Sequence, residues 1–340
     1  MARHEAKKKL AKWQIALLVL LALVFLLAAA ISGVLTHYLN KINRPEENPV
    51  YLEEEEYVSM VLAEEEPPAD LSVVEPSDVR LPTNTGLLEL KGDVTNVLLI
   101  GQDRRPGEGR ARSDSIILCS INKTSNQITL VSFLRDLYVE IPGYQANRIN
   151  ASYAYGGADL LSETLKVNFG VEVDACVEVD FSGFTSLIDA MGGVSVYLTD
   201  TEYQYFQDCN RKYVVPGVNH FDGEDALFYS RIRDIDSDFG RTNRQRNVLT
   251  SLFNQVRNAD AGDLLNIANA LLPLLTVDLT NGQILSYVVE FAPMLSGCSF
   301  VTGYVPADEN FYYASINGMS VIVPDLTACR AQLQELLSAE

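Results

Sequence analysis

Histidine, cysteine and tryptophan are scarce in this sequence. The 340 residues include three histidines (His4, His37 and His220), five cysteines and one tryptophan. Five cysteines are too few for a disulfide scaffold, and no Cys-x-x-Cys pair or Cys/His cluster indicates a zinc site. Catalysis based on histidine is disfavoured, because His220 alone would have to serve the whole region that we expect to fold. Whether Cys298 and Cys329 form a disulfide is left open by the sequence.

Basic residues are also few compared with acidic residues. Lysine and arginine together number 26 against 45 acidic residues, which gives a formal net charge of −19. This balance argues against a nucleic-acid partner, because general nucleic-acid binding needs a basic surface. The hydrophobic fraction of 47% is that of an ordinary globular chain, so wholesale disorder is not expected.

The one long stretch without charge lies near the N-terminus, at residues 13–36. Its 24 positions are mostly apolar and are enough for a transmembrane helix across a bilayer core of about 30 Å. Residues 1–12 are basic and are expected to form a cytoplasmic tail. We therefore expect a single-pass protein of the cell membrane with its C-terminal part outside the cell. The alternative is a cleaved signal peptide, with Ala28 and Ala30 near the cleavage site.

Residues 37–90 have a different composition, with runs of glutamate at 53–56 and 64–66 followed by two prolines. Like charges repel one another, so this segment is interpreted as an acidic extracellular stalk without chemistry of its own. Its more apolar part, residues 57–62, could still pack locally.

Residues 91–340 combine strand and helix patterns around one core. Strands are expected at 96–101, 115–122, 128–133, 175–181, 194–199, 299–305 and 320–324, and helices at 158–170, 182–193, 222–231, 241–259 and 326–338. The first strands after 115 are separated by a short polar turn and should form a hairpin. The pattern predicts an α/β fold, a single layered domain with a central mixed β-sheet flanked by helices.

Arginine is concentrated in two blocks of this acidic chain. One block contains Arg231, Arg233, Arg241, Arg244 and Arg246, and the other contains Arg104, Arg105, Arg110, Arg112 and Arg135. Such concentration favours a bound anion, and phosphate matches the guanidinium fork best. The alternative is ion pairing with neighbouring aspartates, namely Asp136, Asp234, Asp236 and Asp238.

The helix expected at 241–259 strengthens the first interpretation. Arg241 and Gln245 lie on the same side as Leu249 and Leu252, which should face the core. A helix N-terminus also favours an anion, and an inward-pointing charge is costly unless it is matched.

Two aspartates suggest a metal site near the first strand. Asp103 follows the strand at 96–101, and Asp114 lies two residues beyond Arg112 on an extended segment. Both carboxylates could hold a hard divalent cation, for which Mg²⁺ fits best and Mn²⁺ is an alternative. The alternative role for each aspartate is that of a turn former or a helix cap.

Several motifs make the chain resemble the LytR-CpsA-Psr family. They are LLIGQDRR (98–105), RSDSIIL (112–118), VSFLRDLYVEIPG (131–143), RINASYAYGG (148–157), DFSGFTSLIDAMGGVSV (180–196), VPGVNHFDGEDALFYSRIR (215–233) and DSDFGRTNRQR (236–246). The core motifs span 96–260. The chain departs from the family pattern at Leu134, where proline is usual, and at Arg148, where lysine is usual.

The resemblance implies a membrane-anchored bacterial phosphotransferase that works outside the cell. Such enzymes transfer a phosphate-linked anionic glycopolymer, such as wall teichoic acid or capsule, from a polyprenyl-pyrophosphate lipid to peptidoglycan. It implies metal ligation by Asp103 and Asp114, and catalytic roles for Arg112, Arg135, Arg231 and Arg233. It implies substrate binding by Arg105, Asp136, Arg148, Asp238, Arg241, Arg244 and Gln245. The lipid tail would occupy an apolar tunnel between the sheet and the helices.

Two other functions remain open from the sequence. A polyprenyl-pyrophosphate pyrophosphatase would carry the same site, with water in place of the acceptor hydroxyl. A non-catalytic lipid-pyrophosphate binder or regulator, such as a transcriptional attenuator, is the third hypothesis. No general base is assigned, because Asp136 and Asp234 neighbour arginines that should keep them ionised. The particular polymer and the oligomeric state are also unassigned.

Overall fold

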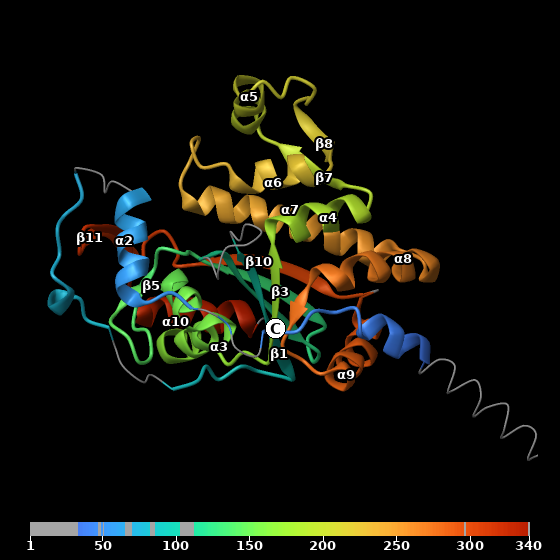
Figure 1. The fold of residues 1–340 in the computed structure, drawn as a ribbon, viewed down its shortest axis with the longest axis horizontal. Helices are drawn as coiled ribbons and strands as arrows, with labels where there is room; N and C mark the ends of the chain where they lie inside the picture. Colours follow the sequence, from blue (N-terminus) through green and yellow to red (C-terminus); the bar gives the residue numbers. More distant parts are fainter. Residues whose placement is uncertain are drawn as a thin grey trace, which may run out of the picture.

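The fold is built around a six-stranded mixed sheet. The computed structural model describes residues 33–46, 49, 51–64, 70–81, 86–102, 112–295 and 297–338. The strand order is β10-β3-β2-β1-β6-β9, with helices on both faces (Figure 1). The sheet consists of β1 (Val94–Gln102), β2 (Ser113–Asn122), β3 (Gln127–Phe133), β6 (Ala175–Asp180), β9 (Thr276–Val277) and β10 (Ser299–Val305). The prediction of an α/β domain with a central mixed sheet is confirmed.

Strand pairing places the carboxyl ends of two central strands at one edge of the sheet. β1 pairs antiparallel with β2 and parallel with β6, and Gln102 lies opposite Asp180 in the parallel pair. β2 and β3 form the expected hairpin, while β10 is parallel to β3. Ligand sites form preferentially where parallel strands end, so this edge is where a site is expected.

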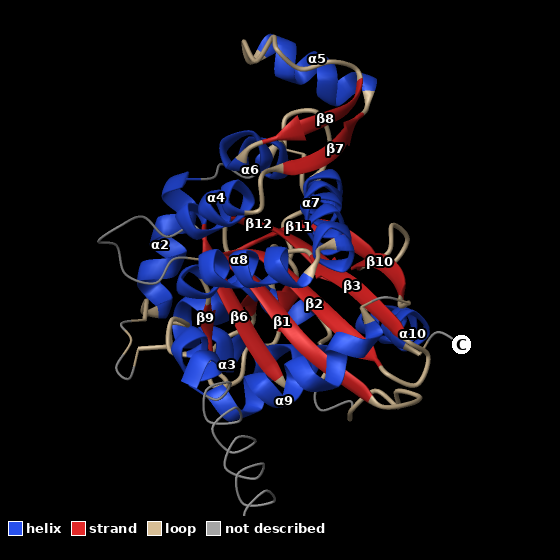
Figure 2. Cartoon of the chain, turned by 90° about the vertical axis from the view of Figure 1, so that its right-hand side faces the viewer, coloured by secondary structure: helices blue, strands red, loops and turns tan. Residues whose placement is uncertain are grey.

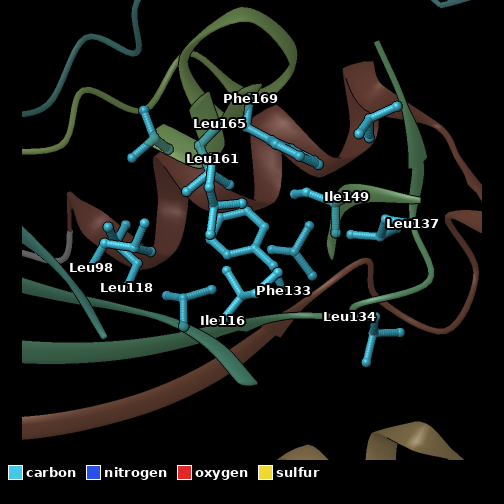
Figure 3. Packing of buried hydrophobic residues seen from close by; sticks show 14 of the residues in the cluster. Leu98, Ile116, Leu118, Phe133, Leu134, Leu137, Ile149, Leu161, Leu165 and Phe169 are labelled. Atoms are coloured by element: carbon cyan, nitrogen blue, oxygen red, sulfur yellow. The ribbon is translucent and has the colours of Figure 1, made fainter. Parts of the chain in front are cut away.

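One face of the sheet is covered by α3 (Ile149–Phe169) and α10 (Leu326–Leu337). Figure 3 shows how side chains of the sheet and of α3 meet in this core. The labelled members are Leu98, Ile116, Leu118, Phe133, Leu134, Leu137, Ile149, Leu161, Leu165 and Phe169, all buried. α3 starts nine residues before the expected helix at 158–170, and it ends as expected at Gly170, whose φ of 70° suits glycine. The early start brings Arg148 to the helix N-terminus.

The other face is covered by α4 (Phe181–Ala190), α6 (Gly223–Arg231) and α7 (Asp238–Asn258). Beyond them, the hairpin of β7 (Val194–Leu198) and β8 (Gly217–Phe221) and the helix α5 (Asp200–Asp208) project from the body of the molecule (Figure 2). α7 is the longest of these helices and brings the second arginine block toward the sheet edge. This face therefore carries the residues that the sequence singles out for anion binding.

The remaining elements are short and complete the domain. They are α2 (Glu54–Glu64), η1 (Pro76–Asp78), β4 (Tyr138–Val139), β5 (Asn147–Arg148), β7 (Val194–Leu198), α5 (Asp200–Asp208), β8 (Gly217–Phe221), α8 (Ala261–Leu271), η2 (Leu272–Leu274), α9 (Asn281–Phe291), η3 (Ala292–Met294), β11 (Phe311–Ile316) and β12 (Met319–Pro324). Cys298 and Cys329 are both buried and both unpaired, so the disulfide left open by the sequence is not formed.

Part of the predicted stalk belongs to the folded domain. In α2, Tyr57 and Val61 are buried against α3 and the β11–β12 pair, and the Tyr57 hydroxyl donates to Asn150 Oδ1 at 2.8 Å. The interpretation of 37–90 as an extended spacer is therefore wrong for this helix, whereas local packing of residues 57–62 is confirmed. Helix geometry explains the difference, because Tyr57 and Val61 lie one turn apart while Glu53, Glu55 and Glu56 remain at the surface.

The predicted tail at 1–12 and most of the predicted membrane span at 13–36 lie outside the described residues. Residues 33–39 form a helical segment that leads into the domain. Within the part of the chain that the structure describes, no helix combines the length and apolar character needed to cross a bilayer.

Candidate active site

A small polar pocket lies at the sheet edge where β1 ends and β2 begins. Its volume is about 110 Å³. Its lining residues are Gly101, Asp114, Ser115, Phe181, Arg231, Arg233, Arg241 and Gln245. We call it the anion pocket, because three guanidinium groups and one carboxylate surround it. The two arginine blocks, far apart in the sequence, thus meet at one place, since Arg135 of the first block pairs with Asp114.

Arg241 and Gln245 project from the first turns of α7 as the helix pattern predicts. Arg241 is 4% exposed and its Nη2 donates to Asp238 Oδ2 at 2.9 Å, while its buried Nε has no hydrogen-bond partner among the described residues. Gln245 Oε1 accepts a hydrogen bond from the Ser115 hydroxyl on β2 at 3.1 Å. Both side chains therefore point toward the sheet edge.

Electrostatics at Arg241 favour an added anion. Burial is the main cause that lowers the pKa of the Arg241 guanidinium to about 10; Asp238 and Asp114 raise this pKa, Arg135 and Arg233 lower it, and the aspartates do not offset burial. At neutral pH the group still carries its charge. A buried cation with incomplete compensation is stabilised by an anionic ligand, which is the property that phosphate binding requires.

Arg135 follows the end of β3 and bridges two carboxylates. Its Nη1 lies 2.5 Å from Asp114 Oδ1, and its Nε lies 3.6 Å from Asp136 Oδ2. Burial alone would raise the pKa of Asp114, but Arg135, Arg241 and Arg112 hold that pKa below its ordinary value. Asp114 is therefore a carboxylate at neutral pH and balances part of the positive charge of the pocket.

Asp136 and Arg148 form a second layer behind Arg135. Arg148 Nη1 lies 3.4 Å from Asp136 Oδ1, and Arg148 Nε donates to the Ser320 carbonyl at 2.9 Å. Burial would raise the pKa of Asp136, yet Arg135 and Arg148 lower it overall. Arg148 is 1% exposed, does not line the anion pocket, and lies behind Asp136, which also contacts Arg135.

The turn between α6 and α7 supplies the outer side of the pocket. Arg233 Nη2 donates to Asp238 Oδ1 at 3.3 Å, so Asp238 orients both Arg233 and Arg241. The Arg231 guanidinium lies 4.5 Å from the centre of the Phe181 ring. Arg231 and Arg233 are exposed, as expected for groups that receive a ligand from solvent.

Arg244 is a correction to the predicted substrate-binding set. It is 2% exposed, its Nε donates to Glu202 Oε1 at 2.7 Å, its Nη1 donates to the Ile232 carbonyl at 2.9 Å, and its Nη2 pairs with Asp236. These partners tie α7 to α5 and to the turn before α7. Arg244 is therefore a structural residue, as the ion-pairing alternative predicted for part of the block.

Of three other predicted residues, Arg112 is described by the structure, whereas Arg105 and Asp103 are not. Arg112 precedes β2 and helps to lower the pKa of Asp114, so it lies close to that carboxylate. Arg105 and the predicted metal ligand Asp103 lie outside the described residues. Within the described ranges, no group of three or more histidine, cysteine, aspartate or glutamate side chains is arranged to hold a metal ion.

An apolar cavity of about 220 Å³ adjoins the anion pocket. It lies between the sheet and the helices α4, α6 and α7, and its apolar lining residues include Leu99, Ile117, Val177, Val179, Phe184, Leu187, Leu227, Leu249, Leu252 and Leu275. Gly101, Ser115, Phe181, Arg231 and Gln245 line both spaces. An apolar cavity thus leads directly into a cluster of guanidinium groups.

Sequence reasoning missed Ser115 and Phe181, which stand at this junction. The sequence does hold a signal for each. Ser115 follows Asp114 on β2, and Phe181 directly follows the end of β6, at the same sheet edge as Gly101. Neither signal is specific without the strand order, because a serine or a phenylalanine at a strand end is common.

Comparison with known proteins defines the family. The model of the LytR_cpsA_psr family matches residues 64–322, so the chain belongs to this family. The expected family membership is thereby confirmed.

Two kinds of relatives are similar to this chain. The polyisoprenyl-teichoic acid–peptidoglycan teichoic acid transferase TagU of Bacillus anthracis is 31% identical over 242 residues, which cover 68% of this chain and 77% of the relative. The crystal structure of TagT of B. subtilis has a TM-score of 0.58 and 26% identity, covering 78% of this chain and 99% of that one. A structure of YwtF (TagT) with bound octaprenyl pyrophosphate lipid has a TM-score of 0.56 and 25% identity, covering 72% and 90%.

Proposed function

We propose that this chain transfers a phosphate-linked glycopolymer from a polyprenyl-pyrophosphate lipid to peptidoglycan. The observation that carries the proposal is the junction of the anion pocket with the apolar cavity. A polyprenyl pyrophosphate has a charged end and a long apolar tail. These two parts match the anion pocket and the apolar cavity that adjoins it. The printed names of the relatives, which include teichoic acid transferases and a complex with octaprenyl pyrophosphate, support the same substrate class.

The arrangement of side chains suggests how the transfer proceeds. Arg231, Arg233 and Arg241 would hold the pyrophosphate oxygens, and the prenyl chain would lie among the leucines between the sheet and α7. An acceptor hydroxyl oxygen forms a bond to the phosphorus that carries the sugar. The bond from this phosphorus to the bridging oxygen breaks, polyprenyl phosphate leaves, and the hydroxyl proton passes to water. The guanidinium groups stabilise the charge that develops on the phosphate oxygens.

Asp136 and Asp114 are unsuited to act as the base in this step. Both carboxylates have a pKa below the ordinary value, so neither takes up a proton readily near neutral pH. Their proposed role is to keep Arg135 in place and to balance the charge of the pocket before substrate binds.

Magnesium is part of the proposal. Asp114 is a partly exposed, ionised carboxylate at the pocket wall, which fits the oxygen ligands that Mg²⁺ prefers. Together with Asp103 it would hold the ion, which when bound would neutralise pyrophosphate charge. We also propose that residues 13–36 anchor the protein in the cell membrane with the domain outside the cell.

The test is transfer by the full-length protein in detergent or vesicles, with labelled lipid-linked glycopolymer and peptidoglycan as acceptor. We expect label to move to peptidoglycan in the wild type. In Arg135→Lys we expect transfer to fall about 100-fold, because one ammonium group cannot bridge Asp114 and Asp136. Arg257→Lys, on the exposed far end of the same helix that carries Arg241, is the matched control and should retain transfer.

The alternative functions are separate outcomes of this experiment. Release of labelled sugar phosphate at the same rate with and without peptidoglycan would identify a pyrophosphatase. Tight binding of the lipid without any turnover, with several glycopolymers and with added Mg²⁺ or Mn²⁺, would identify a non-catalytic binder.

A further inference from the structure

A second, larger pocket lies at the same edge of the sheet, where β1 and β6 end. Its volume is about 490 Å³. It is lined by Asn43, Arg44, Pro45, Glu46, Pro49, Gln102, Glu178, Asp180, Ser182, Gly183, Pro273, Leu274 and Thr276. We call it the edge pocket. Part of the lining comes from residues 43–46 and Pro49, on the side of the predicted anchor, and another part comes from the ends of the two parallel strands.

Gln102 leaves a buried hydrogen-bond acceptor in this pocket. Its side chain is 6% exposed, and its Nε2 donates to Glu178 Oε2 at 3.0 Å. Because a carboxylate oxygen only accepts hydrogen bonds, the atom of the Gln102 amide that faces Glu178 is the nitrogen. The amide oxygen Oε1 is therefore the remaining polar atom of the side chain. Oε1 is buried and has no donor among the described residues. A buried acceptor without a donor indicates that a ligand supplies one.

Glu178 is held in place by neutral groups. Its Oε2 also accepts from the Tyr153 hydroxyl at 2.5 Å, and the side chain is 4% exposed. The arrangement is rigid, because Gln102 comes from β1, Glu178 from β6 and Tyr153 from α3. The floor of the edge pocket is thus a preformed set of oxygen acceptors.

The charges of the edge pocket select an uncharged ligand rich in donors. Glu46, Glu178 and Asp180 are acidic, so a phosphate or another anion is disfavoured there. Arg44 is the basic residue of the lining, and it donates to the Val277 carbonyl at 3.3 Å and to Asn281 Oδ1. Among the described residues no metal-ligating cluster exists either. Hydroxyl and amide N–H groups, as in an N-acetylated sugar, match these acceptors.

The edge pocket is adjacent to the proposed site of transfer. Gln102 directly follows Gly101, which lines the anion pocket; because successive strand residues point to opposite faces, the Gln102 side chain lies on the α3 side of β1, and the end of β1 separates the two pockets. Asp180 lines both the edge pocket and the apolar cavity. A sugar in the edge pocket would therefore lie near the pyrophosphate, across the end of β1.

We propose that the edge pocket binds the acceptor, an uncharged N-acetylated sugar of a glycan strand, and directs one of its hydroxyls to the anion pocket. This inference rests on the proposed transferase function and names its acceptor subsite. The role of Gln102 and Glu178 is to position the sugar through hydrogen bonds. Residues 43–46 and Pro49 make the N-terminal part of the chain a component of the acceptor subsite.

The experiment fills the edge pocket without altering the anion pocket. Ser182→Trp places a large ring into the pocket from the exposed start of α4, and Ser186→Trp makes the same change at an exposed position one turn further on, outside the pocket lining. Transfer by the full-length protein is measured with a soluble glycan fragment of peptidoglycan as acceptor. We expect Ser182→Trp to raise the KM for acceptor at least 10-fold while the KM for lipid donor stays within twofold, and Ser186→Trp to match the wild type.

A second variant and a binding measurement keep the inference separate from the proposed function. Gln102→Leu removes the buried acceptor and should also raise the KM for acceptor, with thermal melting as the check on folding. Equal acceptor KM values for Ser182→Trp and Ser186→Trp would overturn the acceptor subsite, and so would loss of donor binding in Ser182→Trp. If the wild type transfers nothing, the proposed function fails, and calorimetry with the glycan fragment alone then tests the pocket: binding by Ser186→Trp but not by Ser182→Trp supports it.

Discussion

Individual arginines in this chain have different roles according to what surrounds their guanidinium groups. Arg241 and Arg233 share Asp238, and Arg241 keeps a buried nitrogen without a hydrogen-bond partner among the described residues. Arg244, three residues further along the same helix, donates from all three of its side-chain nitrogens to protein oxygens. The number of acceptors already present therefore separates a ligand-binding arginine from a structural one.

Arg244→Ala should destabilise the folded protein without changing its affinity for the substrate. It would leave the buried Glu202 carboxylate without its cation, and loss of one partner of a buried pair costs about 3–5 kcal/mol. Chemical unfolding of the variant and the wild type measures the difference. In the fraction that remains folded, affinity for lipid pyrophosphate should equal that of the wild type. A large loss of affinity would instead restore Arg244 to the substrate-binding set.

Asp136 should stabilise the fold in a defined pH range. The pKa of its carboxyl is held below the ordinary value of about 3.9, because Arg135 and Arg148 outweigh the effect of burial. The stabilisation is therefore fully present above that ordinary value and is lost as the pH falls through the lower folded-state pKa. We expect the difference in unfolding free energy between wild type and Asp136→Asn to be constant from about pH 5 to 8 and to shrink below about pH 4. Asp70→Asn, at an exposed position, serves as control.

At the scale of elements, one side of α7 lines two different spaces. Arg241 and Gln245 reach the anion pocket, while Leu249 and Leu252, further along the same side, line the apolar cavity. The helix α7 thus spans the junction between the anion pocket and the apolar cavity. The sequence predicts this helix at 241–259 and the structure places it at 238–258, so the helical period alone was enough to find the inward residues.

Leu249→Trp should shorten the space available to a lipid tail. The larger ring would occupy part of the cavity of about 220 Å³, so affinity should fall for donors with long prenyl chains and change little for donors with short ones. A binding series over chain length with the purified protein gives the comparison. Asn254→Trp, on the exposed side of α7, is the matched control. Equal losses for every chain length would mean that the tail does not lie in this cavity.

At the scale of the whole molecule, the segment before β1 is part of the domain and not only a connector. α2 buries Tyr57 and Val61, Val74 N donates to the Ser315 carbonyl at 3.0 Å, and Leu88 N donates to the Gly170 carbonyl at 2.8 Å. These contacts cover the β11–β12 pair and the end of α3. The folded unit therefore begins well before residue 91.

Tyr57→Ala should lower the unfolding free energy by about 3–5 kcal/mol, because it removes a fully buried aromatic ring and its hydrogen bond to Asn150. Ser59→Ala, on the exposed side of α2, should change it by less than about 0.5 kcal/mol. Urea unfolding of the two variants measures both changes in unfolding free energy. If Tyr57→Ala unfolds at the same urea concentration as Ser59→Ala, α2 does not contribute to the stability of the domain.

Some elements could not be predicted from the sequence for a physical reason. β4, β5 and β9 have two residues each, too few for any periodicity, and exist because longer elements hold them in place. α5, β8 and β11 were also missed. The hairpin of β2 and β3, by contrast, has long apolar runs around a polar turn, and its position is set by local chemistry.

The sequence by itself determined the α/β class, the inward face of α7 and the concentration of arginine, since periodicity and composition are local properties of the chain. Only the tertiary structure decided which arginines meet. Arg135 comes to Asp114 through strand pairing, and Arg241 comes to Ser115 and Gly101 through packing of α7 on the sheet. Arg244 and Arg241 look alike in the sequence, but the fold pairs Arg244 with Glu202 and Asp236, whereas Arg241 pairs with Asp238 and keeps a buried nitrogen without a hydrogen-bond partner among the described residues. Proximity between distant residues depends on strand order and packing, which no local pattern encodes.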